Sequence, residues 1–372
     1  MNNASVVGAT ASVVANHSNN VEYMLSNATK NGNFSDYEAK YDQWPETPLD
    51  RIEYSIHLYV PPFLIVIGTI GNILSYVVQC RPHMMQSSSA HYLAVLAFSN
   101  TVALLIGCGT DWMSRNLLKQ HFISDLTDWL CKIWKFLFAM SVHFPTWLVV
   151  AMSIDRSITV WNPRRAPQIC TLFKARIFTI VIIVGLLCIS VHAMWTYTLI
   201  DKQCYLGQAH HFFHTQIWPW IQAIMFSYIP LVIICFTSLI LIIGHQRNKH
   251  NVQYQPELSP VVICVTISYF VLGSPSIIQN IVEYTLPTHM RMDNNVRAAV
   301  FLARAVTQVE SCMNYSILIF WHMICNRNFV RELRDLFTFP KLRDRNRMQA
   351  VPTVEINGEG VKLDSEIGVT TL

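Results

Sequence analysis

Residues 177–199 read IFTIVIIVGLLCISVHAMWTYTL, an apolar stretch without a single Asp, Glu, Lys or Arg. Such a segment is long enough to cross about 30 Å of hydrocarbon as an α-helix, which satisfies every backbone hydrogen bond within itself. Six other stretches share this length and apolar character: Leu58–Val78, His91–Trp112, Ile133–Ile154, Trp218–Ile243, Val261–Val282 and Ala298–Ile324. The sequence therefore predicts an all-α membrane protein, a bundle of seven transmembrane helices.

The composition of the whole chain agrees with this fold class. Of 372 residues, 52% are hydrophobic and 13% are charged, whereas a soluble domain needs roughly a quarter of its residues charged. The net charge of +4 is small and the basic residues form short clusters, which disfavours a nucleic-acid partner. The sequence also lacks clustered intramembrane His, Asp or Glu, so we expect no enzyme activity, no metal site and no cofactor.

Charged residues are distributed unevenly among the connecting segments. If the N-terminus lies outside, the inner connections are basic: Arg81, Arg164, Arg165, Lys174, Arg176, Arg247, Lys249, Arg327, Arg331 and Arg334. Because Lys and Arg accumulate in short cytoplasmic loops, we expect a multi-pass plasma-membrane chain with an extracellular N-terminus. Four Asn-x-Ser/Thr sequons fit this orientation and begin at Asn3, Asn16, Asn27 and Asn33.

The chain is expected to have four parts. These are a glycosylated extracellular tail (1–57), the helix bundle (58–324), a juxtamembrane amphipathic helix (325–340) and a disordered cytoplasmic tail (341–372). The short eighth helix would place one apolar face in the membrane interface: Phe329, Val330, Leu333, Leu336 and Phe337. Membrane lipid is therefore an expected partner, although this helix can instead pack on the bundle as a soluble segment.

Two cysteines are expected on the outer side of the membrane. Cys131 lies at the mouth of the third span and Cys204 lies in the loop after the fourth. An oxidising compartment allows them to pair, which would pin that loop across the bundle. Two free thiols are the alternative.

Several short motifs follow one another along the chain in a fixed order. Besides the two outer cysteines they are Gly71-Asn72, His91–Thr101 (HYLAVLAFSNT), Asp155-Arg156-Ser157, Pro230, Pro275, Asn314-Tyr315-Ser316 and Asn328-Phe329. In this order and spacing the chain resembles a rhodopsin-like (class A) G-protein-coupled receptor, most similar to invertebrate neuropeptide receptors. The resemblance covers about residues 55 to 337 and implies a heterotrimeric G protein as the inner partner.

The resemblance assigns a coupling switch to four residues. Arg156 would form an ion pair with Asp155 that releases when the bundle opens toward a G protein. Pro230 and Pro275 each remove a helical hydrogen bond and would act as hinges. Without the resemblance, Arg156 can equally be an arginine that extends to the membrane interface, and the prolines can simply shape packing.

The chain also departs from the family pattern. Asn100 stands where members usually carry a sodium-binding Asp, and Gly273 replaces the usual aromatic residue before the sixth-helix proline. The seventh-helix Asn-Pro-x-x-Tyr corresponds to Leu318–His322, and the usual fourth-helix Trp is missing near Gly185. These departures put the ordinary switch mechanics in doubt.

The ligand class is narrowed by two positions. Receptors for biogenic amines carry an Asp in the third helix that pairs with the amine, and Phe138 stands at that place here. Opsins carry a seventh-helix Lys that binds retinal, and the corresponding residue here is Cys312. The resemblance therefore disfavours both biogenic amines and retinal as ligands. Polar and aromatic residues remain near the outer ends of the spans, and a peptide would need such groups. The candidates for ligand binding are Trp134, Lys135, Phe138, Gln222, Gln279, Asn280, Glu283, Arg304 and Gln308.

Three other features have competing interpretations. Trp218 and Trp220 are either part of the mouth or interfacial anchors. Glu310 and His143 lie deep in predicted spans, where they mark an ion path or, more simply, buried hydrogen-bonded groups. The run His210–His214 can bind zinc on a helix but is more simply a pH-sensitive loop.

The leading functional hypothesis is a peptide receptor that shifts a two-state bundle toward G-protein engagement. One alternative is a receptor of the same fold that no longer signals and serves as a scavenger or partner subunit. A membrane transporter is disfavoured because no repeated halves with midplane charges are evident. The last residues, Thr370-Thr371-Leu372, make a PDZ-domain protein a candidate partner at the C-terminus.

Overall fold

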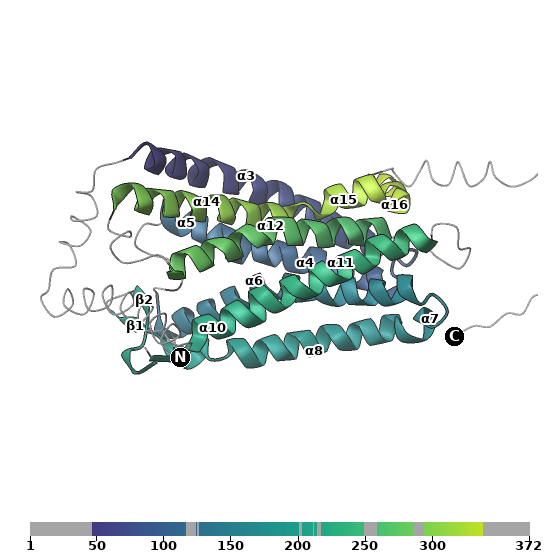
Figure 1. Ribbon diagram of the computed structural model, residues 1–372, viewed down its shortest axis with the longest axis horizontal. Coiled ribbons are helices and arrows are strands. Elements are labelled where there is room, and N and C mark those ends of the chain that lie inside the picture. Colours follow the sequence, from purple (N-terminus) through teal and green to yellow (C-terminus); the bar gives the residue numbers. More distant parts are fainter. Residues whose placement is uncertain are drawn as a thin grey trace, which may run out of the picture.

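The computed structural model describes residues 47–116, 124, 126–200, 203–210, 212–213, 217–248, 259–285 and 293–337. The four sequons, the tail 341–372 with its C-terminal motif, and His211 and His214 lie outside these residues. The described chain forms a bundle of long helices that lie side by side along the longest axis (Figure 1). The predicted fold class, a seven-helix membrane bundle, is thereby confirmed.

The first three spans begin at capped helix ends. The first is α3 (Pro48–Gln79), the second comprises α4 (Ser88–Val102), the π-helical turn η1 (Ala103–Gly109) and α5 (Thr110–Asn116), and the third is α6 (Asp128–Trp161). Thr47 and Asp50 form a capping box at the start of α3, in which the Thr47 amide donates to the Asp50 carboxylate at 2.8 Å. This cap starts the first helix at Pro48, earlier than the expected Leu58.

The fourth span ends before the sequence analysis expected. The helix α8 (Leu172–Ser190) is followed by the short α9 (Ala193–Thr196) and by strand β1 (Tyr197–Ile200). The predicted span Ile177–Leu199 is therefore wrong at its C-terminal end. Strand β1 pairs antiparallel with β2 (Gln203–Leu206), so its backbone hydrogen bonds are satisfied by a neighbour and not by a helix.

Of the last three spans, the fifth and the seventh are interrupted helices and the sixth is continuous. The fifth comprises α10 (Trp218–Ala223), the π-helical turn η5 (Ile224–Tyr228) and α11 (Ile229–Asn248), and the sixth is α12 (Ser259–Thr285). The seventh was expected to be continuous, but a turn at Ile317 divides it into α14 (Asn294–Ser316) and α15 (Leu318–Cys325). Six helices of the described chain are long and apolar enough to cross a membrane; α14 is less apolar because it carries Arg297, Arg304 and Glu310.

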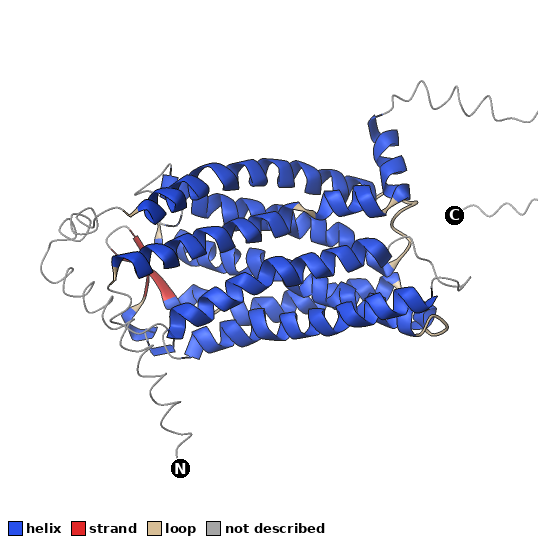
Figure 2. Cartoon of the chain, turned by 45° about the horizontal axis from the view of Figure 1, so that its top comes forward, coloured by secondary structure: helices blue, strands red, loops and turns tan. Residues whose placement is uncertain are grey.

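The two ends of the bundle carry different short elements. The β1–β2 hairpin and the 3₁₀ turn η3 (Gln208–His210) lie at one end, while α7 (Ala166–Ile169) and α16 (Arg327–Phe337) lie at the other (Figures 1 and 2). Figure 2 shows α16 turning away from the bundle axis, as expected for the short eighth helix. Phe329 is buried against the bundle, whereas Phe337 at the far end of α16 is exposed.

Close helix packing fixes the seventh span against the first. A Cβ added at Gly71 of α3 would lie 2.6 Å from Ile319 Cγ2 of α15, which is far inside van der Waals contact. One turn earlier, a Cβ added at Gly68 would lie even closer to the Ser316 hydroxyl oxygen. Asn72 completes this contact, because its amide donates a 2.8 Å hydrogen bond to the Tyr315 carbonyl.

Candidate functional site

A disulfide ties the hairpin to the third span. Cys131 and Cys204 are bonded with a Cα–Cα distance of 5.4 Å, which confirms the pairing expected from the sequence. Cys131 is fully buried at the first turn of α6, and Cys204 pairs across the hairpin with Leu199. The hairpin is therefore held at the end of the bundle, beside the outer turns of α6.

A carboxylate that the sequence analysis missed supports the same hairpin. Asp128 Oδ1 accepts hydrogen bonds from the Leu199 amide at 2.9 Å and the Thr198 hydroxyl at 3.0 Å. Its other oxygen forms a 2.5 Å ion pair with Lys132 one turn along α6. The i, i+4 Asp–Lys pair at a helix start was a readable signal, but its contact with the hairpin depends on the fold.

The predicted ligand residue Arg304 lies on the inward face of α14. Val306 and Met313, seven residues apart, are exposed and mark the lipid side, whereas Tyr315 is buried on the opposite side. Arg304 shares the face of Tyr315, because eleven residues make three helical turns. Its guanidinium lies 5.6 Å from the Phe301 ring, and Gln308 continues the same face one turn further in.

The third span contributes an aromatic and a basic group. Phe138 is 40% exposed, although the residues one heptad away on either side of it, Cys131 and Pro145, are buried. Phe138 therefore lies on the face of α6 that carries these two buried residues. Lys135 Nζ lies 5.4 Å from the Tyr197 ring of the hairpin, and Trp134 is half-buried next to it.

Two glutamines complete the predicted ligand set that the structure describes. Gln279 of α12 accepts a 2.5 Å hydrogen bond from Thr307 of α14. Gln222 is exposed, one and two turns before the buried Phe226 and Pro230 of the fifth span. The side chains of the remaining two candidates, Asn280 and Glu283, lie outside the described residues.

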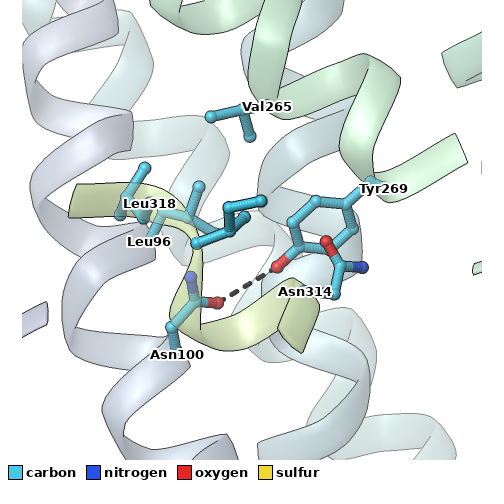
Figure 3. Close-up of a pocket in the computed structure, with 7 residues that line it drawn as sticks. Leu96, Asn100, Val265, Tyr269, Asn314 and Leu318 are labelled. Atoms are coloured by element: carbon cyan, nitrogen blue, oxygen red, sulfur yellow. Dashed lines mark hydrogen bonds between the residues drawn. The ribbon is translucent and has the colours of Figure 1, made fainter. Parts of the chain in front are cut away.

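A small, mainly apolar pocket lies between the helices of the bundle. Its lining residues are Leu96, Asn100, Val265, Tyr269, Asn314, Ile317 and Leu318 (Figure 3). The Tyr269 hydroxyl donates a 3.0 Å hydrogen bond to Asn100 Oδ1, which joins α12 to α4 (Figure 3). The sequence analysis had singled out Asn100 for its missing charge but had not found this partner. The lining residues include no carboxylate, so nothing in this pocket balances the charge of a cation.

The other end of the bundle holds Asp155 and Arg156. Ser88 donates a 2.7 Å hydrogen bond to Asp155 Oδ2, and the nearly buried Arg156 donates from Nε to the hydroxyl of Ser89. Two adjacent serines of α4 thus hold two adjacent charged residues of α6. The sequence analysis expected an ion pair between Asp155 and Arg156 and missed both serines.

Further hydrogen bonds join the helices at this end. Trp321 of α15 donates to Ser268 of α12 at 2.9 Å. At the same end, Arg81 forms a 2.7 Å ion pair with Glu332 of α16. The neighbouring Gln79 lies 3.5 Å from the His322 ring, at the position of the missing motif tyrosine.

One of the two predicted hinge prolines lies next to a distorted helical turn. Pro230 follows the π-helical turn η5, and such turns widen a helix locally. Pro275 lies inside α12, two residues after Gly273, beside which a Cβ would have no atom within 4 Å. The hinge role of both prolines stays a prediction.

The isolated ionisable groups inside the bundle form no cluster. His143 stacks on Phe226 with ring centroids 3.7 Å apart, and Glu310 Oε2 is buried without a hydrogen-bond partner among the described residues. Over the described parts of the chain, no group of three or more His, Cys, Asp or Glu side chains is placed to hold a metal ion.

Comparison with known proteins finds seven-transmembrane receptors that the chain resembles. Residues 71–317 match the family described as 7 transmembrane receptor (rhodopsin family). The chain is 25% identical over 127 residues to the neuromedin U receptor homolog nmur-2 of Caenorhabditis elegans, covering 32% of this chain and 31% of the relative. It is 26% identical over 123 residues to the growth hormone secretagogue receptor type 1 of Sus scrofa, with the same coverage. The matched part thus spans less than a third of each relative.

Proposed function

The chain belongs to the rhodopsin family of seven-transmembrane receptors, and from this premise we propose that it is a G-protein-coupled receptor for a peptide ligand. The two relatives are receptors named for neuromedin U and for a growth hormone secretagogue, which supports this class of function. We propose the plasma membrane as its location, with the N-terminus outside.

The observation that carries the proposal is the contrast between the two ends of one bundle. At the hairpin end, Phe138, Gln222 and Arg304 are exposed side chains on three different helices, α6, α10 and α14. Aromatic and donor groups gathered at one end of a bundle suit the carbonyls and side chains of a peptide. At the opposite end, Asp155 and Arg156 sit where a G protein would insert.

The central hydrogen bonds suggest how binding is transmitted. The Tyr269–Asn100 bond ties α12 to α4, and the Trp321–Ser268 bond ties α15 to α12. Opening of the inner end would require α12 to swing about Pro275 and would break both ties. A ligand that favours the swung position shifts the population toward the open state.

The orientation has its own test. Basic inner loops and the sequons at Asn3, Asn16, Asn27 and Asn33 support an extracellular N-terminus. N-glycosidase treatment should lower the apparent mass, and replacing all four asparagines by glutamine should abolish that shift. An N-terminal epitope accessible only after permeabilisation would contradict the orientation.

We also propose Thr370–Leu372 as a PDZ-binding end, to be tested with a C-terminal peptide on a PDZ array.

The coupling of the two ends is tested by changing one residue at each. Arg156→Ala should abolish G-protein activation while ligand affinity changes by less than about tenfold, because coupling between sites typically amounts to 1 to 3 kcal/mol. Arg304→Ala should weaken ligand potency with maximal signalling recovered at high concentration. Cells expressing each variant would be screened with a peptide library read by calcium and cAMP, with Arg51→Ala on the first helix as control.

One observation favours a second candidate function. Three switch positions, Asn100, Gly273 and His322, carry residues that differ from the family pattern. A scavenger or partner subunit would keep the ligand mouth and lose coupling. In that case the wild-type chain binds its peptide without recruiting any G protein, and Arg156→Ala changes nothing.

A further inference from the structure

Two free cysteines meet where the sixth span packs against the seventh. The sulfur atoms of Cys264 in α12 and Cys325 in α15 lie 3.8 Å apart, close enough for an S–H···S hydrogen bond. Neither takes part in the outer disulfide, which joins Cys131 to Cys204. The two cysteines are 61 positions apart in the chain and lie on different helices, so only the fold brings their thiols together.

A second contact fixes the register between these two helices. The Trp321 indole donates a 2.9 Å hydrogen bond to the Ser268 hydroxyl. Ser268 lies one turn after Cys264 on α12, and Trp321 lies one turn before Cys325 on α15. The helices therefore pack antiparallel here, and the two contacts are successive links between them. Helix packing, and not a loop, positions the thiol pair.

The thiol pair lies near the end of the bundle that carries α16. Cys325 is the last residue of α15, and Cys264 is five residues after the start of α12 at Ser259 (Figure 1). Five residues rise by about 7.5 Å along a helix. Both cysteines are half-buried, and the nearby Ile267 and Ile324 are exposed on the lipid side. A small molecule at this end of the bundle can therefore reach the thiols.

The surroundings favour a bond between the two sulfurs over binding of a metal ion. Among the residues that the structure describes, no group of three His, Cys, Asp or Glu side chains is placed to hold a metal. Structural zinc sites are almost always four-coordinate, so two thiols alone hold such an ion poorly. Two thiols in contact are instead the arrangement in which oxidation of one sulfur leads to a disulfide with the other.

We propose that Cys264 and Cys325 form a reversible redox site, which hydrogen peroxide converts into a disulfide between α12 and α15. One thiol loses its proton and its sulfur attacks a peroxide oxygen, which breaks the O–O bond and gives a sulfenic acid and one water. The thiol of the other helix then attacks that sulfur, which forms the S–S bond and releases a second water. Two electrons pass from the sulfurs to the peroxide, and a thiol reductant such as glutathione reverses the oxidation.

The disulfide holds the sixth span against the seventh at the end where the bundle would open. Opening by a swing of α12 about Pro275 is part of the proposed function, and this consequence rests on it. Cys264 lies about three helical turns from Pro275, on the side that must move. Oxidation should therefore remove G-protein activation while the ligand still binds. Formation of the bond itself does not depend on signalling.

The test follows the bond in the purified full chain. The chain in nanodiscs is treated with hydrogen peroxide, free thiols are blocked with iodoacetamide, and its peptides are analysed by mass spectrometry without reduction. We expect a linked peptide pair containing Cys264 and Cys325 that disappears after glutathione treatment, whereas the outer Cys131–Cys204 pair persists. The unfolding temperature should rise, because the new bond joins positions 61 residues apart. Hydrogen exchange near the start of α12 should slow, because local opening is restrained.

The variants leave one thiol at a time. Cys264→Ser and Cys325→Ser should each lose the linked peptide and the rise in unfolding temperature, and each should keep G-protein activation after oxidation. Cys188→Ser removes an exposed cysteine of α8 and is the matched control, which should respond to peroxide as the wild type does. Unfolding temperatures before oxidation verify that the variants fold, and alanine variants at the same two positions replace any serine variant that does not.

Three results would overturn the proposal. The first is a folded wild type that yields no linked peptide after oxidation. The second is a linked peptide that leaves hydrogen exchange of α12 unchanged, because the bond would then restrain nothing. The third is peroxide inhibition that persists in Cys264→Ser, because another thiol would then be responsible. A wild type that never recruits a G protein contradicts the proposed function alone, since the linked peptide and the slowed exchange still decide the redox site.

Discussion

Removing one buried hydroxyl should raise the basal activity of this receptor. In Tyr269→Phe, the hydrogen bond to Asn100 is lost while the ring and its packing remain. Both side chains are almost fully buried, and Asn100 Nδ2 already lacks a partner among the described residues. The substitution therefore weakens the tie between α12 and α4 without opening a cavity.

The size of the effect follows from the energy of one buried hydrogen bond. Such a bond contributes about 0.5 to 1.5 kcal/mol net, and a group left unsatisfied adds to the loss. A closed state weakened by about 1 to 1.5 kcal/mol favours the open state roughly five- to twelvefold. If the open state holds about 1% of the molecules, its share rises to about 5 to 11%.

The assay is ligand-independent G-protein activation in cells, compared at equal surface expression. Tyr92→Phe is the matched control, because Tyr92 is a buried tyrosine of the same core whose hydroxyl has no hydrogen-bond partner among the described residues. Asn100→Ala should also raise basal activity, and adding Tyr269→Phe to it should have little further effect. Unchanged basal activity in Tyr269→Phe, or additive effects in the double variant, would refute the idea that this bond holds the closed state.

Three further predictions concern stability and reactivity. Cys131→Ala or Cys204→Ala should each sharply reduce surface expression, because the disulfide closes a loop of 73 residues and thereby stabilises the fold by about 4 kcal/mol. Maleimide labelling of both cysteines in the wild type would contradict this. Gly71→Ala should destabilise the chain by about 1 to 3 kcal/mol through overpacking against α15, whereas Gly185→Ala, with open space around it, should be neutral or stabilising; equal melting temperatures would refute this contrast. Burial raises the pKa of the Cys170 thiol to about 11, which disfavours the thiolate, so its maleimide labelling should be slow at pH 7.4 and accelerate above pH 10; labelling at the rate of a free peptide thiol would contradict the burial of this thiol.

Much of the fold was predictable from local sequence because the hydrocarbon core imposes a local rule. A segment such as 177–199 has no other way to satisfy its backbone, so fold class and number of spans follow from length and apolarity. The rule weakens at the ends of spans, where lipid no longer excludes other partners. That is why Tyr197–Leu199 was expected to be helical and is a strand, and why the capped start at Pro48 was missed.

The candidate site was predictable only in part. Cys131 and Cys204 could be paired from the sequence, because topology leaves few cysteines on one side of the membrane. The positions of Asp155 and Arg156 followed from a motif. Their partners did not, because Ser88 and Ser89 lie on another helix and carry no signal of their own.

The sequence by itself determined that this chain is a seven-helix membrane bundle of the receptor type, since spans, basic loops and motif order are all readable residue by residue. Only the tertiary structure decided which polar groups meet inside it. Tyr269 and Asn100 are 169 residues apart, and Arg156 and Ser89 are 67 apart. In a dry interior a polar side chain must take a partner from whichever helix packs beside it, and helix packing is settled by the shapes of all seven spans together.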